Sequence, residues 1–213
     1  YITFGTFHRT NKLSRSVIAQ WAKLLRAIPN AKLVLGGLQT SAVKHVLGWF
    51  ADEAIEQSRL LVEPRGSVYD YLALHHKVDV CLTPFPYTGS TTVCHALWMG
   101  VPTLTTIGPT SPSHAGVCFL AHLGLSSFVT DNDDSFVKLG VFLSENPAEL
   151  ATLRETMRAR FTSSVVGHPV VAASGLERAF RIMWQRWCEG VPPETFRIRL
   201  ADLMDTSEPG DAA

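Results

Sequence analysis

The chain has 213 residues, which is enough for one α/β domain with a sizeable core and short for two. Nineteen basic and nineteen acidic residues cancel, so no overall positive field would gather nucleic acid or an anionic membrane. Apolar stretches such as residues 115–125 are broken by His122 and Gly124 and are shorter than the roughly 20 residues that a membrane span needs. Composition therefore excludes a polyanion-binding or membrane-spanning protein and predicts a soluble domain.

The four cysteines, Cys81, Cys94, Cys118 and Cys188, are widely spaced, with no CxxC pair and no His at a zinc-ligand spacing. This pattern indicates reduced, buried thiols and a cytoplasmic protein. The chain begins with Tyr1 and runs directly into a strand-like segment. We therefore expect the natural protein to begin further upstream.

Short β-branched, apolar runs alternate with segments of helical period, which is typical of a mostly parallel sheet with helices on both faces. We expect a doubly wound α/β fold whose strands lie at residues 2–7, 32–35, 60–63, 78–83 and 103–107. Helices are expected at residues 14–28, 41–57, 68–76, 91–99, 113–123, 135–145, 148–161 and 172–188. The first of these is the best marked, because a Ser14 N-cap precedes a continuous apolar stripe.

The C-terminal part of the chain reads as helical and then as irregular. Three of the expected helices follow one another without strands, and Trp184 and Trp187 on the last are expected to pack against the sheet. From Ala201 onward no periodicity remains. The sequence thus predicts one domain over residues 1–200 and a disordered tail over residues 201–213.

A loop after the fourth expected strand has the composition of a phosphate site. Residues 84–92 read PFPYTGSTT and lead directly into a helical segment. In open parallel sheets, ligands bind where strands end and helices begin. Gly89, Ser90, Thr91 and Thr92 would offer unpaired N–H groups, hydroxyl donors and the positive end of a helix dipole to a diphosphate. A simple helix cap formed by Ser90 or Thr91 explains the same residues, so both interpretations stay open.

Two other strand ends carry candidates of the same kind. Arg9 and Lys12 follow the first strand and are suited to phosphate oxygens, although a solvated surface pair would look the same. After the third strand, Gly66 would let the backbone approach a base and Tyr71 would stack on it. The alternative for this segment is a turn followed by a half-buried core tyrosine.

Residues 131–134 read DNDD and look like a metal-binding carboxylate pair. They stand immediately before an expected helix, which favours a solvated N-terminal cap over a metal site. No other His, Cys or carboxylate residues have ligand spacing, and we expect no metal. His114 is the one further His that lies near the predicted cleft.

The three candidate phosphate and base segments, taken in chain order, resemble the C-terminal catalytic lobe of the O-GlcNAc transferase and SPINDLY family. The most diagnostic stretch is residues 85–92 followed by ALWMGVP at residues 96–102. The opening residues 3–7 with Lys12 and the closing residues 179–184 also match. The similarity covers nearly all of residues 1–200.

The resemblance implies a GT-B glycosyltransferase of which this chain is the Rossmann-like, donor-binding lobe. Members transfer GlcNAc from UDP-GlcNAc to Ser or Thr of proteins, with inversion and without a metal or other cofactor. The protein acceptor would be held by an N-terminal lobe and by upstream tetratricopeptide repeats, so this chain alone is expected to be inactive. The alternatives are a SPINDLY-like protein O-fucosyltransferase that uses GDP-fucose, a non-catalytic interaction module with the same fold, and a sugar-nucleotide epimerase.

The resemblance also implies roles for individual residues. Lys12 would stabilise the diphosphate leaving group with Arg9 beside it, while the catalytic base would belong to the other lobe or to the substrate. His95 would face the ribose, where the family usually has Asp or Glu. The remaining predicted donor-binding residues are Gly66, Tyr71, Gly89, Ser90, Thr91, Thr92 and His114.

Overall fold

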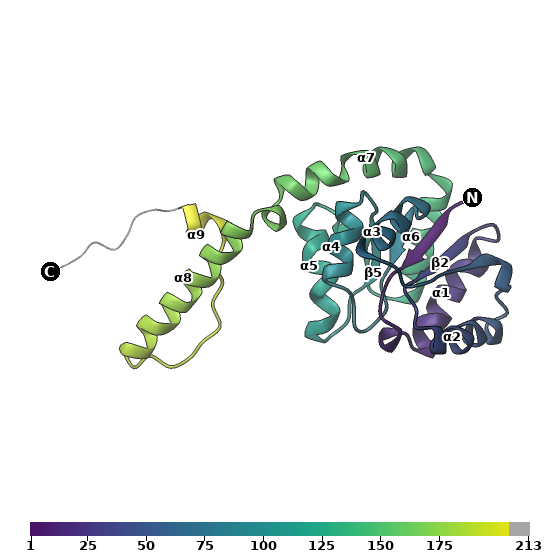
Figure 1. The fold of residues 1–213 in the computed structure, drawn as a ribbon. Helices are drawn as coiled ribbons and strands as arrows, with labels where there is room; N and C mark the ends of the chain where they lie inside the picture. The colour runs from purple at the N-terminus through teal and green to yellow at the C-terminus, as the bar shows by residue number, and fades with distance from the viewer. Residues whose placement is uncertain (205–213) are drawn as a thin grey trace. The chain divides into compact units, whose positions relative to one another are not determined.

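The computed structural model describes the backbone of residues 1–204. The first part of the chain forms a parallel six-stranded sheet (Figure 1). The strand order is β3-β2-β1-β4-β5-β6, which confirms the predicted doubly wound fold and puts the reversal of strand order between β1 and β4. The first five strands were predicted, whereas β6 has only two residues and leaves no alternating pattern. The strands are β1 (Thr3–Thr6), β2 (Lys32–Gly36), β3 (Leu60–Glu63), β4 (Val80–Leu82), β5 (Thr103–Thr106) and β6 (Val129–Thr130).

Helices cover both faces of the sheet. Because crossovers between parallel strands are right-handed, α1 and α2 share one face, and they pack together. α6 follows the last strand and packs against α1 on the same face. The other face carries α3, α4 and α5, of which α4 and α5 pack together. The helices are α1 (Arg15–Ala27), α2 (Thr40–Asp52), α3 (Val68–Ala73), α4 (Thr91–Trp98), α5 (Ala115–His122), α6 (Asp133–Glu145), α7 (Pro147–Ser163), α8 (Pro169–Cys188) and α9 (Leu200–Met204).

The core fills both faces of the sheet: α1 covers one side, and Val93, Ala96 and Leu97 of α4 are buried on the other. Ser14 caps α1 as predicted, its hydroxyl accepting from the N–H of Val17. The predicted apolar stripe is buried, and Trp21 is its largest fully buried side chain. The central strands β1 and β4 are fully buried as well. Close packing therefore fixes the positions of their carboxyl ends.

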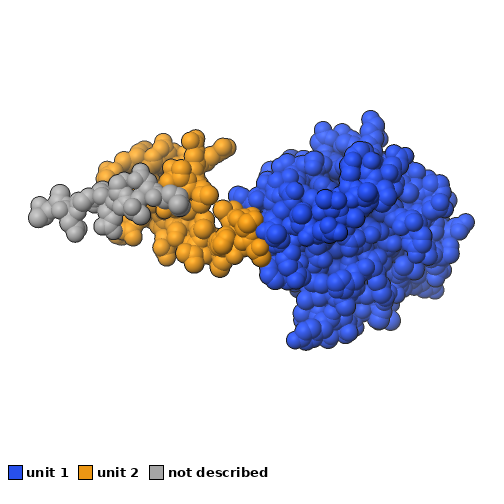
Figure 2. Space-filling view, turned by 90° about the horizontal axis from the view of Figure 1, so that it is seen from above, with its two compact units in different colours: residues 1–161 blue, residues 162–213 orange. Residues whose placement is uncertain are grey.

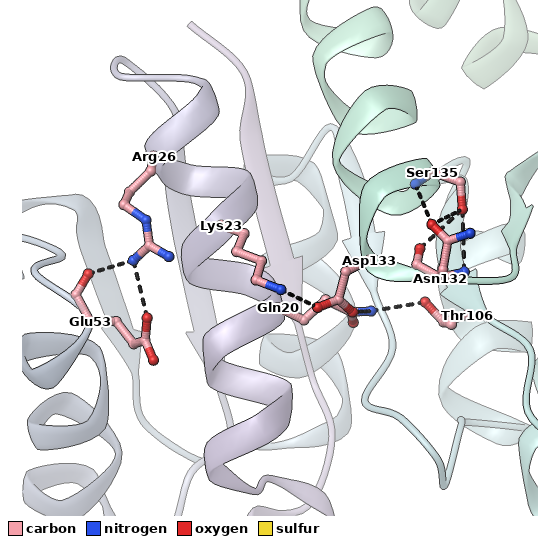
Figure 3. A network of polar contacts seen from close by, with 8 residues as sticks. All are labelled: Gln20, Lys23, Arg26, Glu53, Thr106, Asn132, Asp133 and Ser135. Atoms are coloured by element: carbon pink, nitrogen blue, oxygen red, sulfur yellow. Dashed lines mark hydrogen bonds and ion pairs between the residues drawn. The ribbon is translucent and has the colours of Figure 1, made fainter.

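A polar network fastens α1 to α6 and β5 (Figure 3). The buried Gln20 amide donates to Thr106 Oγ1 at 3.1 Å and to Asp133 Oδ1 at 2.9 Å. Lys23 Nζ bonds the second oxygen of Asp133 at 2.6 Å. Asn132 is the N-cap of α6 and forms a reciprocal capping box with Ser135. The DNDD segment is therefore a helix cap, and no cluster of metal-ligating side chains forms among the described residues.

We expect Gln20→Leu to lower the free energy of unfolding by about 1–2 kcal/mol, because a buried donor to two acceptors is lost. Lys23→Ala removes only an exposed ion pair and should cost less than about 1 kcal/mol. Urea denaturation of both variants measures the difference. A larger loss for the lysine variant would contradict the role assigned to the buried amide.

The described part of the chain divides into two compact units, residues 1–161 and the residues from Thr162 onward (Figure 2). The single donor-binding domain expected over residues 1–200 stays a prediction. Trp184 and Trp187 belong to the second unit, so their predicted packing against the sheet of the first unit stays a prediction. α9 covers residues 201–204 of the stretch expected to be a disordered tail, and residues 205–213 lie outside the described residues.

The cysteines are all free in the described chain, but they are not all buried. Cys81 is buried and Cys94 is half-buried, whereas Cys118 and Cys188 are exposed. The prediction of buried thiols is therefore wrong for Cys118 and Cys188. None of the helices in residues 1–204 is both long enough and apolar enough to cross a membrane.

Candidate functional site

The first unit has a cleft at the carboxyl ends of β1 and β4, where the strand order reverses. Its two adjoining hollows have volumes of about 930 Å³ and about 610 Å³. The larger hollow lies between the loop after β1 and the start of α4, and the smaller lies beside α3. The residues shared by both are Phe7, His8, Arg9, Asn11, Arg65 and Tyr71.

The larger hollow brings Lys12 to the hydroxyl-rich start of α4. Lys12 Nζ donates to the carbonyl of Thr88 at 2.9 Å and lies 4.1 Å from the ring centroid of Tyr87. Thr91 and Thr92 line the same hollow. The predicted pairing of an early lysine with a mid-chain helix start is therefore present on one side of the sheet.

The start of α4 keeps its donors available. Ser90 is the N-cap residue, but its side chain forms no capping hydrogen bond, so the simple-cap interpretation of Ser90 is wrong. Ser90 and Thr91 are both exposed to the hollow. Backbone N–H groups of a first helical turn have no partner within the helix and carry a positive partial charge. This end of the cleft is therefore built to receive an anion.

The loop before α4 is held from below by two buried residues. The Thr88 hydroxyl donates to the carbonyl of Pro112 at 3.1 Å and accepts from the N–H of Gly116 at 3.1 Å. Gly89 leaves no room for a side chain, because a Cβ there would meet His8 and Thr92. Gly89 thus shapes the floor of the hollow and does not line it.

His8 lines both hollows and is bonded through Nδ1 to Thr92 Oγ1 at 3.2 Å. Burial lowers the pKa of His8 from 6.5 to about 3, and the positive charge of Lys12 acts in the same direction. His8 is therefore neutral at physiological pH. It supports Thr92 without adding a second positive charge to the site.

The stability of the protein should fall as the pH falls from 6.5 to about 3. Unfolded His8 binds a proton below pH 6.5, whereas folded His8 stays neutral until about pH 3, so protonation favours the unfolded state in this window. We expect the plot of unfolding free energy against pH to be shallower in His8→Asn, by up to about 1.4 kcal/mol per pH unit. Urea denaturation between pH 4 and 7 measures both slopes, and equal slopes would contradict the assignment.

The smaller hollow contains the predicted base-binding residues. Gly66 and Tyr71 line it, and Ser67 caps α3 in a capping box with Asp70. The Tyr71 ring meets Phe7 edge-on, with centroids 5.7 Å apart. The two residues that the sequence predicts for a base therefore line the same hollow.

His95 on α4 contacts Tyr71, which lines both hollows. Its Nδ1 lies 3.0 Å from the hydroxyl of Tyr71, and it lines the larger hollow. His114, by contrast, lines neither hollow: it is exposed and its Nε2 bonds the carbonyl of Gly108 at 2.8 Å. The structure therefore brings together every predicted site residue except His114, with Gly89 beneath the floor.

The charge of the cleft is entirely basic. Arg9, Lys12 and Arg65 line it, and no Asp or Glu is among the described residues that line either hollow. Partial burial, with the neighbouring Arg9, lowers the pKa of Lys12. An anionic ligand would relieve this repulsion. Sequence reasoning missed Arg65, His8 and Tyr87, although Arg65 has the same signal as Arg9, a cation just after a strand.

Comparison with known proteins agrees with this geometry. Residues 1–170 match the family described as glycosyl transferase family 41. The probable UDP-N-acetylglucosamine–peptide N-acetylglucosaminyltransferase SPINDLY of Arabidopsis thaliana is 32% identical over 204 residues, which are 94% of this chain and 22% of that protein. The chain thus spans less than a quarter of the length of that relative.

Solved structures give the same result for the fold. A mutant O-GlcNAc transferase of Thermobaculum terrenum superimposes with a TM-score of 0.80 and 28% identity, over 89% of this chain and 37% of that one. The sucrose-phosphate synthase of Thermosynechococcus elongatus, at 14% identity and a TM-score of 0.61, covers 86% of this chain and 46% of its own and bears on the fold alone. The GT-B fold that the sequence implied is confirmed.

Proposed function

Because this chain belongs to glycosyl transferase family 41, we propose that it is the donor-binding lobe of an enzyme that transfers GlcNAc from UDP-GlcNAc to Ser or Thr hydroxyls of proteins. The observation that carries the proposal is the meeting of Lys12 with the start of α4 in a cleft lined by cations. A nucleotide diphosphate carries negative charge, which would balance the positive charge of the cations that line this cleft. The choice of donor sugar follows the N-acetylglucosaminyltransferase and O-GlcNAc transferase relatives.

In the proposed reaction, negative charge builds up on the departing diphosphate as its bond to the sugar breaks. Lys12 and the first turn of α4 would stabilise that charge where it develops, a contribution worth several kcal/mol in favourable sites. With these groups supplying the positive charge, we propose that transfer needs no divalent metal. Attack on the face opposite the leaving group would then invert the sugar.

The acceptor hydroxyl must also lose a proton during transfer. No carboxylate is among the described residues that line the cleft, and His8 is engaged with Thr92. We therefore propose that the base belongs to a second lobe or to the bound substrates. That lobe, with the upstream repeats expected from the resemblance, would also bind the protein acceptor. We propose that the reaction takes place in the cytoplasm.

Calorimetric titration of the 213-residue chain with UDP and with GDP, in the presence of a chelator, tests the proposal. We expect UDP to bind without divalent ions and GDP to bind about tenfold more weakly, because a base pocket discriminates by one or two hydrogen bonds. A preference for GDP would replace the proposed donor by GDP-fucose. Failure of both nucleotides to bind at millimolar concentration would identify a non-catalytic module.

A GDP-sugar donor is the second candidate. The hollow beside Gly66 and Tyr71, at about 610 Å³, has room for a purine as well as for a pyrimidine. Product analysis with a protein acceptor distinguishes transfer from either donor from the activity of a sugar-nucleotide epimerase. An epimerase would change the free sugar nucleotide with no acceptor present.

A further inference from the structure

Tyr71 and His95 form a polar pair across the cleft that the roles above do not use. They come from different helices, α3 and α4, and the phenol oxygen lies 3.0 Å from Nδ1 of His95. Both side chains line the larger hollow. Among the described residues, no hydrogen bond involves the other ring nitrogen of His95, Nε2.

The chemistry of the two groups sets the direction of this hydrogen bond. A phenol is a strong donor, and an unprotonated imidazole nitrogen is a strong acceptor. Burial raises the pKa of Tyr71, so the phenol keeps its proton. A neutral imidazole carries one N–H, and when Nδ1 accepts, that proton must be on Nε2.

The Tyr71 hydroxyl is held in place from several sides. The ring makes edge-on contacts with Phe7 at 5.7 Å and with His75 at 5.2 Å between centroids. His75 is buried, and its Nδ1 lies 3.2 Å from the carbonyl of Tyr71 itself. The capping box of Ser67 fixes the helix turn that carries the ring. The phenol is therefore a rigid partner that can determine the state of His95.

We propose that Tyr71 is a positioning residue that holds His95 as its Nε2–H tautomer, so that His95 presents a hydrogen-bond donor and selects an acceptor oxygen on the ribose of the nucleotide. The choice of ligand rests on the proposed function, whereas the tautomer is a property of the free chain. A carboxylate in this position would select the opposite: a ribose hydroxyl that donates. The kind of ribose group that His95 selects therefore depends on the Nε2 proton, whose position Tyr71 determines.

The tautomer is tested without nucleotide. Two-bond proton–nitrogen spectra of the 15N-labelled chain distinguish a bare ring nitrogen from a protonated one, and His95→Gln identifies the signals of His95 among the eight histidines. We expect Nδ1 bare and Nε2 protonated, with Tyr71→Phe increasing the Nδ1–H fraction. A proton on Nδ1 in the native chain, or an unchanged ratio in Tyr71→Phe, would overturn the proposal.

Ligand selection is tested with UDP or GDP, whichever binds more tightly, and with its 2′- and 3′-deoxy and O-methyl forms. An O-methyl group keeps the acceptor oxygen and removes the donor proton, whereas a deoxy position lacks both. At the hydroxyl that His95 contacts, we expect the deoxy form to bind about tenfold more weakly than the parent nucleotide and the O-methyl form to bind better than the deoxy form. In His95→Asp, the O-methyl form should lose as much as the deoxy form.

The outcomes separate this inference from the proposed function. If the O-methyl form loses as much as the deoxy form in the native chain, His95 is not a donor to the ribose and the inference fails, although nucleotide binding stands. If neither nucleotide binds, the proposed function fails, and the ribose selection fails with it. The tautomer spectra still decide whether Tyr71 controls the state of His95.

Discussion

Lys12→Ala should weaken the binding of UDP by about a hundredfold, because the charge-assisted contact to the diphosphate is lost at its centre. The lysine is positioned before any ligand arrives, by its hydrogen bond to the Thr88 carbonyl and by the ring of Tyr87. Lys44→Ala, at an exposed position on α2, is the matched control and should leave affinity unchanged. Calorimetry measures both, and thermal unfolding checks that both variants stay folded. An affinity loss below about threefold in Lys12→Ala would remove the lysine from the site.

The same lysine predicts the pH dependence of binding. Its pKa is lowered by partial burial and by Arg9, so the cation is lost at a lower pH than that of a free lysine. A diphosphate beside it favours the charged form and raises the pKa again. Affinity should therefore fall as the pH rises through the alkaline range, with proton uptake on binding. Calorimetry in buffers with different ionisation enthalpies measures that uptake, and its absence in Lys12→Ala assigns it.

The strand ends that carry the site were predictable, because parallel strands share one edge and each candidate follows a strand. Lys12 and Thr92 stand 80 positions apart in the sequence, yet the order β3-β2-β1-β4-β5-β6 makes their loops neighbours. His114 was misplaced because the turn before α5 directs its ring to the carbonyl of Gly108, which depends on local backbone geometry. Periodicity does not report such geometry.

Contacts between two side chains were the least predictable part. Two hydrogen bonds join different elements across the cleft, Tyr71 with His95 and His8 with Thr92. Each of these residues, taken alone, is equally compatible with a surface or core role. The sequence pattern placed Tyr71 beside a base and the family resemblance placed His95 beside a ribose. Neither contained a sign that the two side chains bond each other. Their hydrogen bond depends on how far α3 and α4 lie apart, which only packing determines.

Gly89→Ala should lower the free energy of unfolding by about 1–3 kcal/mol, the usual cost of overpacking a filled site. A Cβ at this position would meet the ring of His8 and the hydroxyl of Thr92, and His8 is only 5% exposed and has little room to move. Displacing Thr92 would also shift the first turn of α4, so UDP affinity should fall by at least about tenfold. Urea denaturation and calorimetry measure the two effects.

Gly48→Ala is the matched control, because Gly48 lies inside α2 and a Cβ there meets no atom within 4 Å. It should raise stability by about 0.5–1 kcal/mol, since alanine favours a helix over glycine. The two glycines thus predict opposite signs for the same chemical change. His8→Ala should partly relieve the crowding in Gly89→Ala, so the double variant should lose less than the sum of the single variants. Additive losses would mean that Gly89 is required for a reason other than its contact with His8.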